Sequence, residues 1–558
     1  MRQFAFSRRE VVGGVAALVP AVLLPPSLGR AAGVPVHLRS DPAQRVFHVR
    51  DYGARGDADT ITGGGTDDTA AIQAAVDAAY RAKGGLVVFE PGATYKLGPS
   101  SAVGPNIMGA PSIMLRPGVS FDGQGCHLYQ TAKATIIGLQ ERFHRFAQVI
   151  EDVARDDRSV TVDYPEIFTP GQSVFLRIGE NGFQPIEPRY TLIAKVASVR
   201  GRRVVLDRPI AAPVVIDETT QENCRLHVMA QPIEGIAVRN FHFHSPPDTS
   251  PECGLLLVAA RDIRVENLWA HGNIGAGLLN FQFVEDIRCR DIIVLRNANP
   301  TNHSAMGRAV TLSNARDCVI ERLVARELSS TAVFIESHST GIRLRHVDIV
   351  YTSAKAWGPP VFFAAEDSEV VYENVYLRTM EPAIVHDSGG SPVRYYFNNL
   401  TFSSPVFPIV MPPAHRLAGI LRMQIAGKEF AYDLRRVQIS RKTVPLPSSR
   451  TIVVDDLPAG LLVRYETRLS ADLPESVLSE AWIKSAGGVG DNFVGNIQPN
   501  RRRMTVPEQG IGTHNNSYAS TEMLVQPRQL LLVTAAYDAG EISKPPELSI
   551  WLHIAPRI

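Results

Sequence analysis

The sequence predicts an all-β protein whose main part is a parallel β-helix, a solenoid of stacked coils. The chain has 558 residues, which is too long for one ordinary compact core, and its 45% hydrophobic and 20% charged content is typical of globular proteins. A strand-like pattern recurs seven times at a nearly constant spacing, and a second short apolar run precedes most of these repeats. Regular recurrence of one structural unit is the sequence signature of a solenoid.

Residues 1–32 are expected to be an export signal peptide. They combine an arginine-containing start, an apolar run from Val11 to Leu24 and a stretch of small residues. The run is shorter than the roughly 20 residues that span a bilayer, so it does not predict a transmembrane helix. Arg8 and Arg9 in SRREVV resemble a twin-arginine signal, with an ordinary secretory signal as the alternative. We therefore expect a periplasmic or secreted bacterial protein that is not membrane-bound after signal removal.

Charge and cysteine content exclude two further classes. The formal net charge is +1, and removing residues 1–32, which hold four arginines and one glutamate, leaves −2. No basic excess remains to predict nucleic-acid binding. The five cysteines have no metal-ligand spacing and predict buried thiols rather than a disulfide framework, with one disulfide left open. They are Cys126, Cys224, Cys253, Cys289 and Cys318.

The first regular element is a short amphipathic helix within residues 66–82. Ile72, Ala75, Val76 and Ala79 have the spacing of one apolar helix face. Thr66 is the expected N-cap, which places the adjacent carboxylates of residues 67 and 68 in the first turn, where the helix dipole favours negative charge. Lys83 and the glycines at 84 and 85 supply the stop. This carboxylate pair is therefore interpreted as structural rather than catalytic.

The segment from Val46 to Gly98 also resembles the N-terminal segment of a known superfamily. It is similar to the pectate-lyase-like, polygalacturonase-related right-handed parallel β-helix proteins, which include hydrolases, lyases, mannuronan epimerases and phage tailspikes. The resemblance implies a right-handed solenoid and a polysaccharide ligand. The Asn-Thr-Asp, Asp-Asp, Gly-His-Gly and Arg-Ile-Lys motifs of polygalacturonases and the acidic calcium cluster of pectate lyases are not found in this sequence, so no catalytic residue is carried over.

The repeat gives the solenoid its coils. Strands of the form apolar-x-apolar-x-Asn/Asp-apolar begin at 236, 263, 287, 318, 342, 370 and 395, with spacings of 27, 24, 31, 24, 28 and 25 residues. Alternating apolar residues are expected to point into the coils. Asparagine or aspartate is expected to end these strands as a turn-former that tolerates left-handed geometry. These residues are Asn240, Asn267, Asp291, Asn374 and Asn399.

The regions that lack the repeat define the expected domain boundaries. Residues 45–141 are assigned to the cap helix and first coils, and 223–418 to the main coils. Residues 142–222 contain short strands around Pro-Gly and Arg-Gly turns, which predict a small inserted β-barrel. Residues 419–558 alternate without the repeat and predict a C-terminal β-sandwich.

A polar column on the outer face of the coils indicates the candidate site. In the strands that precede the repeats, one residue of each strand is assigned to an inward column: Leu257, Phe281, Leu312, Ile335, Phe363 and Val385. The residue after each faces outward: Val258, Gln282, Ser313, Glu336, Ala364 and His386. The longest loops adjoin the polar middle of this column, and a solenoid builds its sites from such loops and outward side chains.

We expect a polysaccharide-degrading enzyme with its site around Glu336. In a glycoside hydrolase, Glu336 and Asp387 are the expected acid and base, with His303 and His338 as neighbours. In a polysaccharide lyase acting on a uronate, His303, Lys355 or Tyr351 serves as base and Arg308 neutralises the substrate carboxylate. The expected substrate-binding residues are Gln282, Ser313, Asn302, Trp357, His271 and His386.

Other possibilities stay open. A non-catalytic carbohydrate-binding module of the tailspike or adhesin type would use the same face. No cofactor is expected, although Glu366, Asp367 and Glu369 would suit calcium if their loop folds back. The protein is expected to be a monomer or a homotrimer.

Overall fold

The computed structural model describes the chain from Arg45 onward, in segments. These are residues 45–99, 111–138, 145–178, 190–216, 224–230, 232–246, 253–272, 277–295, 307–328, 331–336, 338–351, 362–364, 369–378, 384–385, 394–404, 409–410, 416–425 and 428–445, the strands named below from Thr451 to Pro556, and Ile558. The predicted signal peptide lies outside the described residues.

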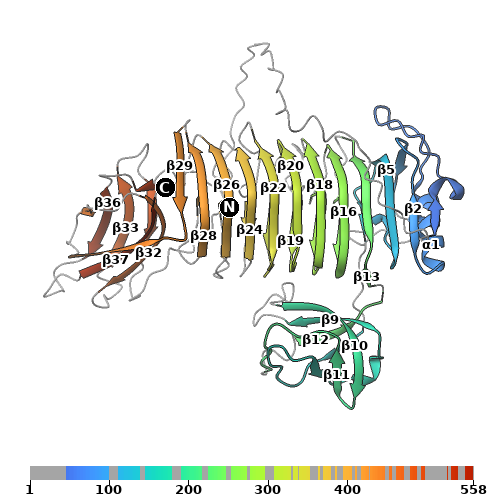
Figure 1. The fold of residues 1–558 in the computed structure, drawn as a ribbon, viewed down its shortest axis with the longest axis horizontal. Helices are drawn as coiled ribbons and strands as arrows, with labels where there is room; N and C mark the ends of the chain where they lie inside the picture. Colours follow the sequence, from blue (N-terminus) through green and yellow to red (C-terminus); the bar gives the residue numbers. More distant parts are fainter. Residues whose placement is uncertain are drawn as a thin grey trace, which may run out of the picture. The chain divides into compact units, whose positions relative to one another are not determined.

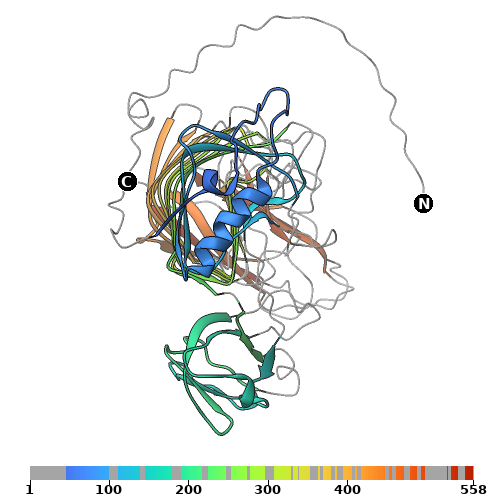
Figure 2. The ribbon, with the colours of Figure 1, turned by 90° about the vertical axis from the view of Figure 1, so that its right-hand side faces the viewer.

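The N-terminal helix covers the first coils. Helix α1, Thr69–Arg81, buries the predicted apolar face, because Ile72, Ala75, Val76 and Ala79 are all 0% exposed. Figure 2 shows α1 lying across the end of the coils. The left-handed backbone of Lys83 and Gly84 follows the helix, as the stop signal predicts.

The start of α1 differs from the prediction. The N-cap is Asp68 rather than Thr66, and its side chain makes no cap hydrogen bond. Its buried carboxylate instead accepts hydrogen bonds from the backbone N–H groups of Arg55 (2.7 Å) and Gly56 (3.0 Å). Asp67 Oδ1 accepts one from the backbone of Thr69 (3.0 Å). Asp68 thus fastens the loop at Arg55 and Gly56 to the start of the helix, whereas Asp67 binds the first residue of the helix.

The repeats form one long, mainly parallel sheet. Its order is β1-β2-β5-β14-β16-β18-β20-β22-β24-β26-β28-β29, with β3 beside β5 and β13 beside β16; only the last pair, β28 and β29, is antiparallel. The seven repeats are β14 to β26, even numbers only, and lie side by side in Figure 1. Val238, Val265, Cys289, Ile320, Leu344, Tyr372 and Phe397 are successive Cα partners, which confirms the predicted repeat.

The strands of this sheet have the following bounds. They are β1 Val46–His48, β2 Gly85–Val88, β3 Thr94–Leu97, β5 Val119–Gln130, β13 Ile233–Glu234, β14 Ala237–His244, β16 Ala260–His271, β18 Glu285–Leu295, β20 Val319–Arg326, β22 Ile342–Val350, β24 Glu369–Arg378, β26 Arg394–Ser404, β28 Arg416–Ile425 and β29 Lys428–Asp433.

The five predicted turn-formers bend the strands rather than end them. Each adopts a positive φ of 52–63° inside its strand, and the strand continues beyond it. Asn267 donates to Asn240 (2.9 Å) and Asn399 to Asn374 (2.7 Å), so side chains of adjacent coils form amide ladders. Asparagine tolerates left-handed backbone better than most residues, which explains its recurrence at this bend.

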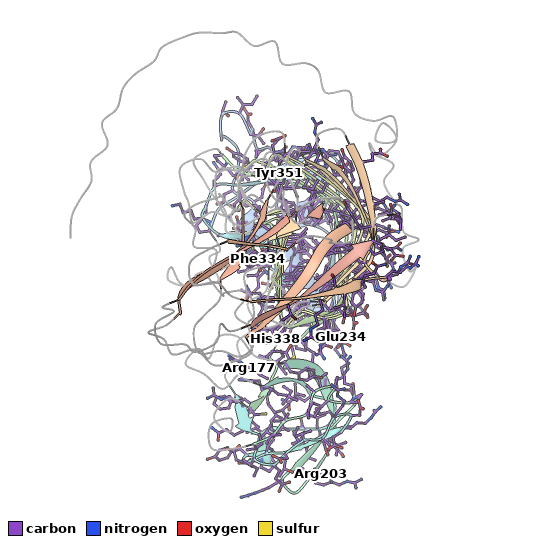
Figure 3. All side chains as sticks on the ribbon, turned by 90° about the vertical axis from the view of Figure 1, so that its left-hand side faces the viewer. Arg177, Arg203, Glu234, Phe334, His338 and Tyr351 are labelled. Atoms are coloured by element: carbon purple, nitrogen blue, oxygen red, sulfur yellow. The ribbon has the colours of Figure 1, made fainter. Side chains whose placement is uncertain are left out.

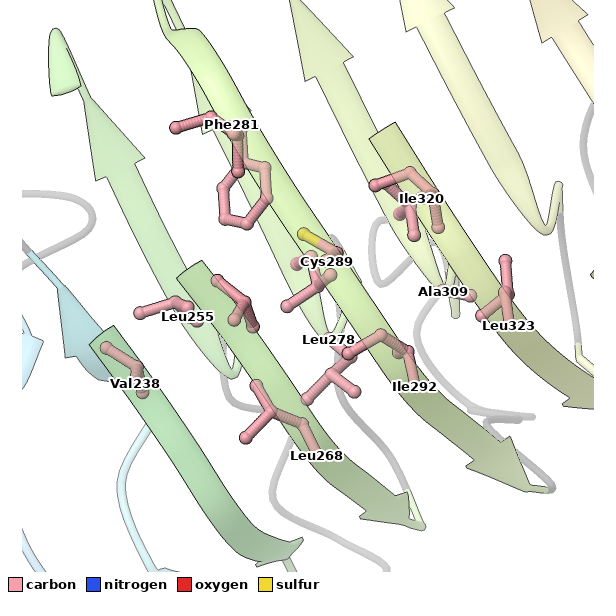
Figure 4. Close-up of a cluster of buried hydrophobic side chains, with 14 of the residues drawn as sticks. Val238, Leu255, Leu268, Leu278, Phe281, Cys289, Ile292, Ala309, Ile320 and Leu323 are labelled. Carbon is pink, nitrogen blue, oxygen red and sulfur yellow. The ribbon is translucent and has the colours of Figure 1, made fainter. Parts of the chain in front are cut away.

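The second runs of the repeats form a nine-stranded parallel sheet. Its order is β4-β6-β15-β17-β19-β21-β23-β25-β27. The bounds are β4 Pro111–Met114, β6 Thr135–Gly138, β15 Leu255–Val258, β17 Leu279–Gln282, β19 Val310–Ser313, β21 Val333–Glu336, β23 Phe362–Ala364, β25 Ile384–Val385 and β27 Ile409–Val410. Apolar side chains of both sheets meet in one core, where Figure 4 shows Phe281 of the nine-stranded sheet near Cys289 of the long sheet.

The inserted segment forms its own closed antiparallel sheet. Its order is β7 Phe146–Gln148, β12 Cys224–Val228, β9 Ser173–Ile178, β10 Tyr190–Arg200, β11 Arg203–Leu206 and β8 Ser159–Thr161. A bridge between Val149 and Val162 joins its two edges. We call this the inserted sheet; β12 belongs to it, although the sequence assigns residues 224–228 to the main coils.

Residues after the last coil form two four-stranded antiparallel sheets. One contains β30 Gln438–Pro445, β37 Glu547–Pro556, β32 Gly460–Leu469 and β35 Leu524–Val525. The other contains β31 Thr451–Val454, β36 Leu530–Tyr537, β33 Leu478–Ala486 and β34 Asn492–Asn496. Strands β28 and β29 belong to the solenoid sheet, although the predicted boundary at 419 falls within β28.

The cysteines are buried thiols, as predicted. All five are buried, and none forms a disulfide. Burial raises the pKa of Cys318 to about 12 and that of Cys126 and Cys289 above the ordinary thiol range. They are therefore packing residues of low reactivity. Within the described part of the chain, no helix has the length and apolarity that crossing a membrane requires.

We predict that Asp68→Asn destabilises the protein by about 1–3 kcal/mol, because the two N–H groups bind different oxygens of Asp68, and asparagine replaces one of these oxygens with an NH₂ group that cannot accept a hydrogen bond. Chemical denaturation followed by circular dichroism measures this loss. The exposed Asp51→Asn is the matched control and should change stability by less than about 0.5 kcal/mol. Equal stability of the two variants would contradict the role assigned to Asp68.

Candidate functional site

The site is built on the outer face of the nine-stranded sheet, where β17, β19 and β21 lie side by side. The first and third residues of each strand are at most 1% exposed and pack in the core. Successive side chains of a strand point to opposite faces, so the second and fourth residues belong to the outer face. The fourth residues, Gln282, Ser313 and Glu336, are Cα partners in adjacent strands, in agreement with the predicted column.

Beyond Glu336 the predicted column is wrong by one residue. Ile335 pairs with Ala364 and Phe334 with Phe363, whereas the prediction aligned Ile335 with Phe363. The run VFFAA contains no polar residue that would fix which face each side chain occupies, and a shift of one residue exchanges the two faces. His386, the last predicted member of the column, lies outside the described residues.

A cation and an aromatic ring lie next to this column. The guanidinium of Arg308 lies 3.6 Å from the ring centroid of Phe334 in the next coil, and Arg308 is only 7% exposed. A guanidinium over an aromatic face is held by cation–π attraction. The sequence predicted Arg308 but missed Phe334; its place in the alternation Val-Phe-Ile before Glu336 was the available signal.

Short polar side chains complete the surface. Gln282 Nε2 donates to Asn280 Oδ1 (3.4 Å), and Thr311 and Ser313 stand at the same two positions of β19. Amides and hydroxyls of this kind pair with sugar hydroxyls. We define the candidate surface as Asn280, Gln282, Arg308, Thr311, Ser313 and Phe334, together with the backbone position of Glu336. Nothing is described of the Glu336 side chain.

His338 stands at the edge of the candidate surface. It is partly buried and has a φ of 56° in the turn two residues after Glu336. The corresponding turn after β19 contains Asn314, with a φ of 49°. Figure 3 labels His338 and Phe334 in a view along the coils. The placement of His338 in the site stays a prediction.

His271 belongs to a different cluster. It ends β16 in the fourteen-stranded sheet, where its ring stacks on His244 at 4.8 Å. His127 stacks on His242 at 4.7 Å and hydrogen bonds His244, with 2.7 Å between Nδ1 and Nε2. Trp269 lies beside His242. We call these five side chains the histidine ladder; the structure does not bring His271 to the candidate surface.

The histidine ladder is neutral over the physiological pH range. Burial lowers the pKa of His244 to about 3 and that of His242 to about 4, and repulsion among the imidazoles lowers them further. Burial also lowers the pKa of His127 and His271. Neutral stacked rings suit a packing role rather than an acid or base that works near neutral pH.

Several predicted site residues lie outside the described residues. These are Asn302, His303, Lys355, Trp357, His386 and Asp387, with Glu366 and Asp367 of the calcium hypothesis. Glu369 is described and starts β24, where its backbone N–H donates to the carbonyl of Ser339 (2.8 Å). Among the described residues, no three His, Cys, Asp or Glu side chains are arranged to hold a metal ion.

Tyr351 is not a candidate base. It is 1% exposed and packs in the core of the coils. Alternation explains the error, because Tyr351 continues the inward positions of Val347 and Ile349 at the end of β22. A base for the lyase hypothesis must therefore come from His303 or Lys355.

The inserted sheet contacts the turns next to the candidate surface. Phe175 of β9 packs edge-on against Phe283, with 5.6 Å between ring centroids. Glu285, which is 5% exposed, accepts from the backbone of Ile193 (3.0 Å) and binds Arg316 (2.5 Å) and Arg208. Sequence reasoning missed this buried network, since its charges lie in separate segments of the chain.

The chain has limited similarity to known proteins, and no family model matches it. It is 41% identical over 80 residues to mannuronan C5-epimerase AlgE1 of Azotobacter vinelandii, which covers 14% of this chain. The same identity over 80 residues is found with mannuronan C5-epimerase AlgE3. The chain spans about 5% of the length of the first epimerase, so the comparison concerns a small part of that protein.

Two solved structures illustrate the structural similarity. The tailspike gp49 of Pseudomonas phage LKA1 is 13% identical, with a TM-score of 0.32, over 91% of this chain and 100% of that chain. The A-module of mannuronan C-5 epimerase AlgE4 of Azotobacter vinelandii is 12% identical, with a TM-score of 0.28, over 67% of this chain and 88% of that chain. The fold assignment rests on the strand pairing described above rather than on these similarities.

We predict that the histidine ladder makes the protein less stable on acidification. Unfolded imidazoles titrate near pH 6.5, whereas His242 and His244 titrate at about 4 and 3 when folded. Between these values the unfolded state binds more protons, so the free energy of unfolding falls as pH drops below 6.5. From pH 7 to 5, these two partly exposed histidines should account for about 1–3 kcal/mol of that fall, because solvent screening reduces the full linkage value.

Denaturant unfolding at pH 7 and at pH 5 measures the change in the free energy of unfolding. The His242→Gln/His244→Gln double variant should lose correspondingly less stability between pH 7 and 5 than the wild type. The exposed His48→Gln serves as the control and should keep the full dependence. A double variant with the wild-type pH dependence would show that the ladder does not cause it.

Proposed function

We propose that this protein is an exported enzyme that degrades an extracellular or cell-envelope polysaccharide by glycoside hydrolysis at the candidate surface. One observation carries the proposal. Arg308 is held over Phe334 directly beside the polar column that runs from Gln282 to Glu336. A sugar-binding site needs an aromatic ring, hydrogen-bonding side chains and ionisable groups, and this surface brings them together on rigid strands.

The arrangement suits a polymer. Equivalent positions of successive coils recur at the strand spacing of about 4.8 Å, so a surface that crosses several coils offers repeated contacts to a chain of sugars. The 80-residue similarity to mannuronan C5-epimerases also supports a polysaccharide ligand. The proposed site of action is the periplasm or the outside of the cell.

Glu336 and Asp387 are the proposed acid and base. Glu336 is the last residue of the polar column in β21, and Asp387 stands two residues after β25 in the sequence. Hydrolysis with inversion needs two carboxyl groups about 6.5–9.5 Å apart, whereas retention needs about 5 Å. The anomeric configuration of the first product therefore decides between the two.

Lyase chemistry is the second candidate, and Arg308 favours it. β-Elimination on a uronate requires a cation that stabilises the carboxylate while a base removes the neighbouring proton. Arg308 supplies a permanent cation, and His303 or Lys355 would supply the base. A binding module without catalysis would use the same surface and release no product.

The reaction products separate these candidates. Purified mature protein should release new reducing ends from its polysaccharide without an ultraviolet-absorbing unsaturated product. Proton NMR of the first product distinguishes an inverted from a retained anomer. Unsaturated products would instead establish the lyase, and binding without products would establish the module.

We predict that Glu336→Gln and Asp387→Asn each lower kcat at least about 100-fold, because each removes a general acid or base. Release of reducing ends measures the effect. The exposed Glu166→Gln of the inserted segment carries the same chemical change and should retain wild-type activity. Full activity of the Glu336→Gln variant would show that the site lies elsewhere.

A further inference from the structure

Two arginines stand directly opposite each other in the inserted sheet. Arg177 of β9 and Arg225 of β12 are Cα partners in antiparallel strands. Side chains in such positions share one face, with Cβ atoms about 5 Å apart, and like charges placed this way destabilise a sheet. The pair therefore costs stability unless an anion lies between the two guanidiniums.

Among the described residues, no carboxylate neutralises this pair. Neither arginine takes part in an ion pair there, whereas Arg208 and Arg316 nearby both bind Glu285. Arg225 Nε is buried without a hydrogen-bond partner. Burial and then the charge of Arg225 lower the pKa of Arg177, as expected for crowded, partly desolvated cations.

An exposed aromatic ring completes the cluster. The guanidinium of Arg225 lies 4.6 Å from the ring centroid of Phe146, which is 39% exposed. His227 lies between Phe146 and Phe175 on the same face, with ring centroids at 5.3 and 6.2 Å. The ring of Phe146 holds the guanidinium of Arg225 in place. The guanidinium therefore loses less conformational entropy when it binds an anion.

This face of the inserted sheet is turned toward the coils. Phe175 and Arg177 are two residues apart on β9 and so share a face, and Phe175 packs on Phe283 of the coil containing β17. Arg177 is the Cα partner of Thr191, whose carbonyl accepts a hydrogen bond from Arg316. Arg316 stands three residues after Ser313 of the candidate surface. The neighbour of Arg177 in the inserted sheet, Thr191, therefore contacts the turn that follows β19.

We propose that Arg177 and Arg225, with the ring of Phe146, form a subsite for the carboxylate of an acidic sugar in a polysaccharide bound at the candidate surface. Two guanidiniums offer paired N–H donors that match a carboxylate, and the ring offers an apolar face to the sugar. The inference rests on the proposed polysaccharide function and names its substrate class: a polymer that contains uronic acids.

Binding rather than turnover tests the subsite. The probes are fluorescently labelled short oligomers of galacturonate and mannuronate, their carboxyl-reduced neutral forms, and a sulfated oligomer of equal charge. Fluorescence anisotropy with the full mature chain should show at least about tenfold tighter binding of a uronate oligomer than of its reduced form. The affinity should fall as salt increases. Because no product is measured, failure of the proposed hydrolysis would leave this result unaffected.

Three variants locate the effect. Arg177→Gln/Arg225→Gln should lose at least about tenfold in uronate affinity and leave binding of the reduced form unchanged. Arg177→Lys/Arg225→Lys keeps the charge without the paired donors and should recover part of the loss. Arg203→Gln is the matched control, because Arg203 is exposed and lies at the opposite end of the inserted sheet from Arg177 in Figure 3.

Several outcomes would overturn the proposal. Equal binding of uronate and reduced oligomers, or no uronate binding, would exclude a carboxylate subsite. Wild-type affinity in the folded glutamine variant would show that the pair does not contact the ligand. Equal affinity for the sulfated oligomer would mean that the site recognises charge alone. Circular dichroism checks that each variant is folded.

Discussion

The whole solenoid depends on in-register stacking of its coils. A parallel strand satisfies its backbone groups only through the strands above and below it, so each coil needs its neighbours in the correct register. Val238, Val265 and Cys289 show this register, because they are successive Cα partners although 24 to 27 residues separate them in sequence. A coil that shifted by one residue would exchange its buried and outer faces. The polar outer column thus exists because the core fixes the register.

The open ends of the solenoid and the bends within its coils require interactions other than strand stacking. An open parallel sheet presents unpaired backbone groups that would recruit other chains. At the N-terminal end, α1 places its apolar face over the first coils, and buried Asp68 fastens the preceding loop to the helix. At the other end, β29 turns back antiparallel on β28. Within each coil, left-handed residues such as Asn240 and Asn267 bend the strand, and their ladder lets one coil support the next.

The sequence predicted the strand register correctly where one pattern recurs along the chain. It placed residues incorrectly where their position depends on a single contact or on an unmarked apolar run. The seven repeats gave the register, since Val238 to Phe397 repeat one alternation seven times. The column from Gln282 to Glu336 followed from the same alternation. The prediction aligned Ile335 with Phe363 instead of Ala364, because the apolar run around Ala364 contains no polar residue that indicates the outer face. Thr66 has the residue type and position of an N-cap. The N-cap is instead Asp68, which binds the loop at Arg55 and Gly56. Local spacing does not reveal such a contact between separate segments.

Site residues follow the same division. Arg308 was found because it ends the longest loop beside the polar column. Its partner Phe334 was missed because an aromatic residue in a β-strand usually indicates core packing. Tyr351 shows the opposite error, a polar-tipped residue that the fold buries. Glu285 and Arg316 could not be paired with Arg208 from sequence, because the inserted sheet brings together residues that are 77 positions apart.

Glu285 explains why the inserted sheet matters to function. A buried carboxylate is costly unless its charge is compensated, and removing one partner of such a group is strongly destabilising. Glu285 binds Arg316 of the coils, Arg208 of the inserted segment and the backbone of Ile193. The contacts with Arg208 and Ile193 join the inserted sheet to the coils. They are kept only if the face of the inserted sheet with Phe175 and Arg177 stays turned toward the coils. The network that holds the inserted sheet therefore also orients the proposed subsite of Arg177 and Arg225.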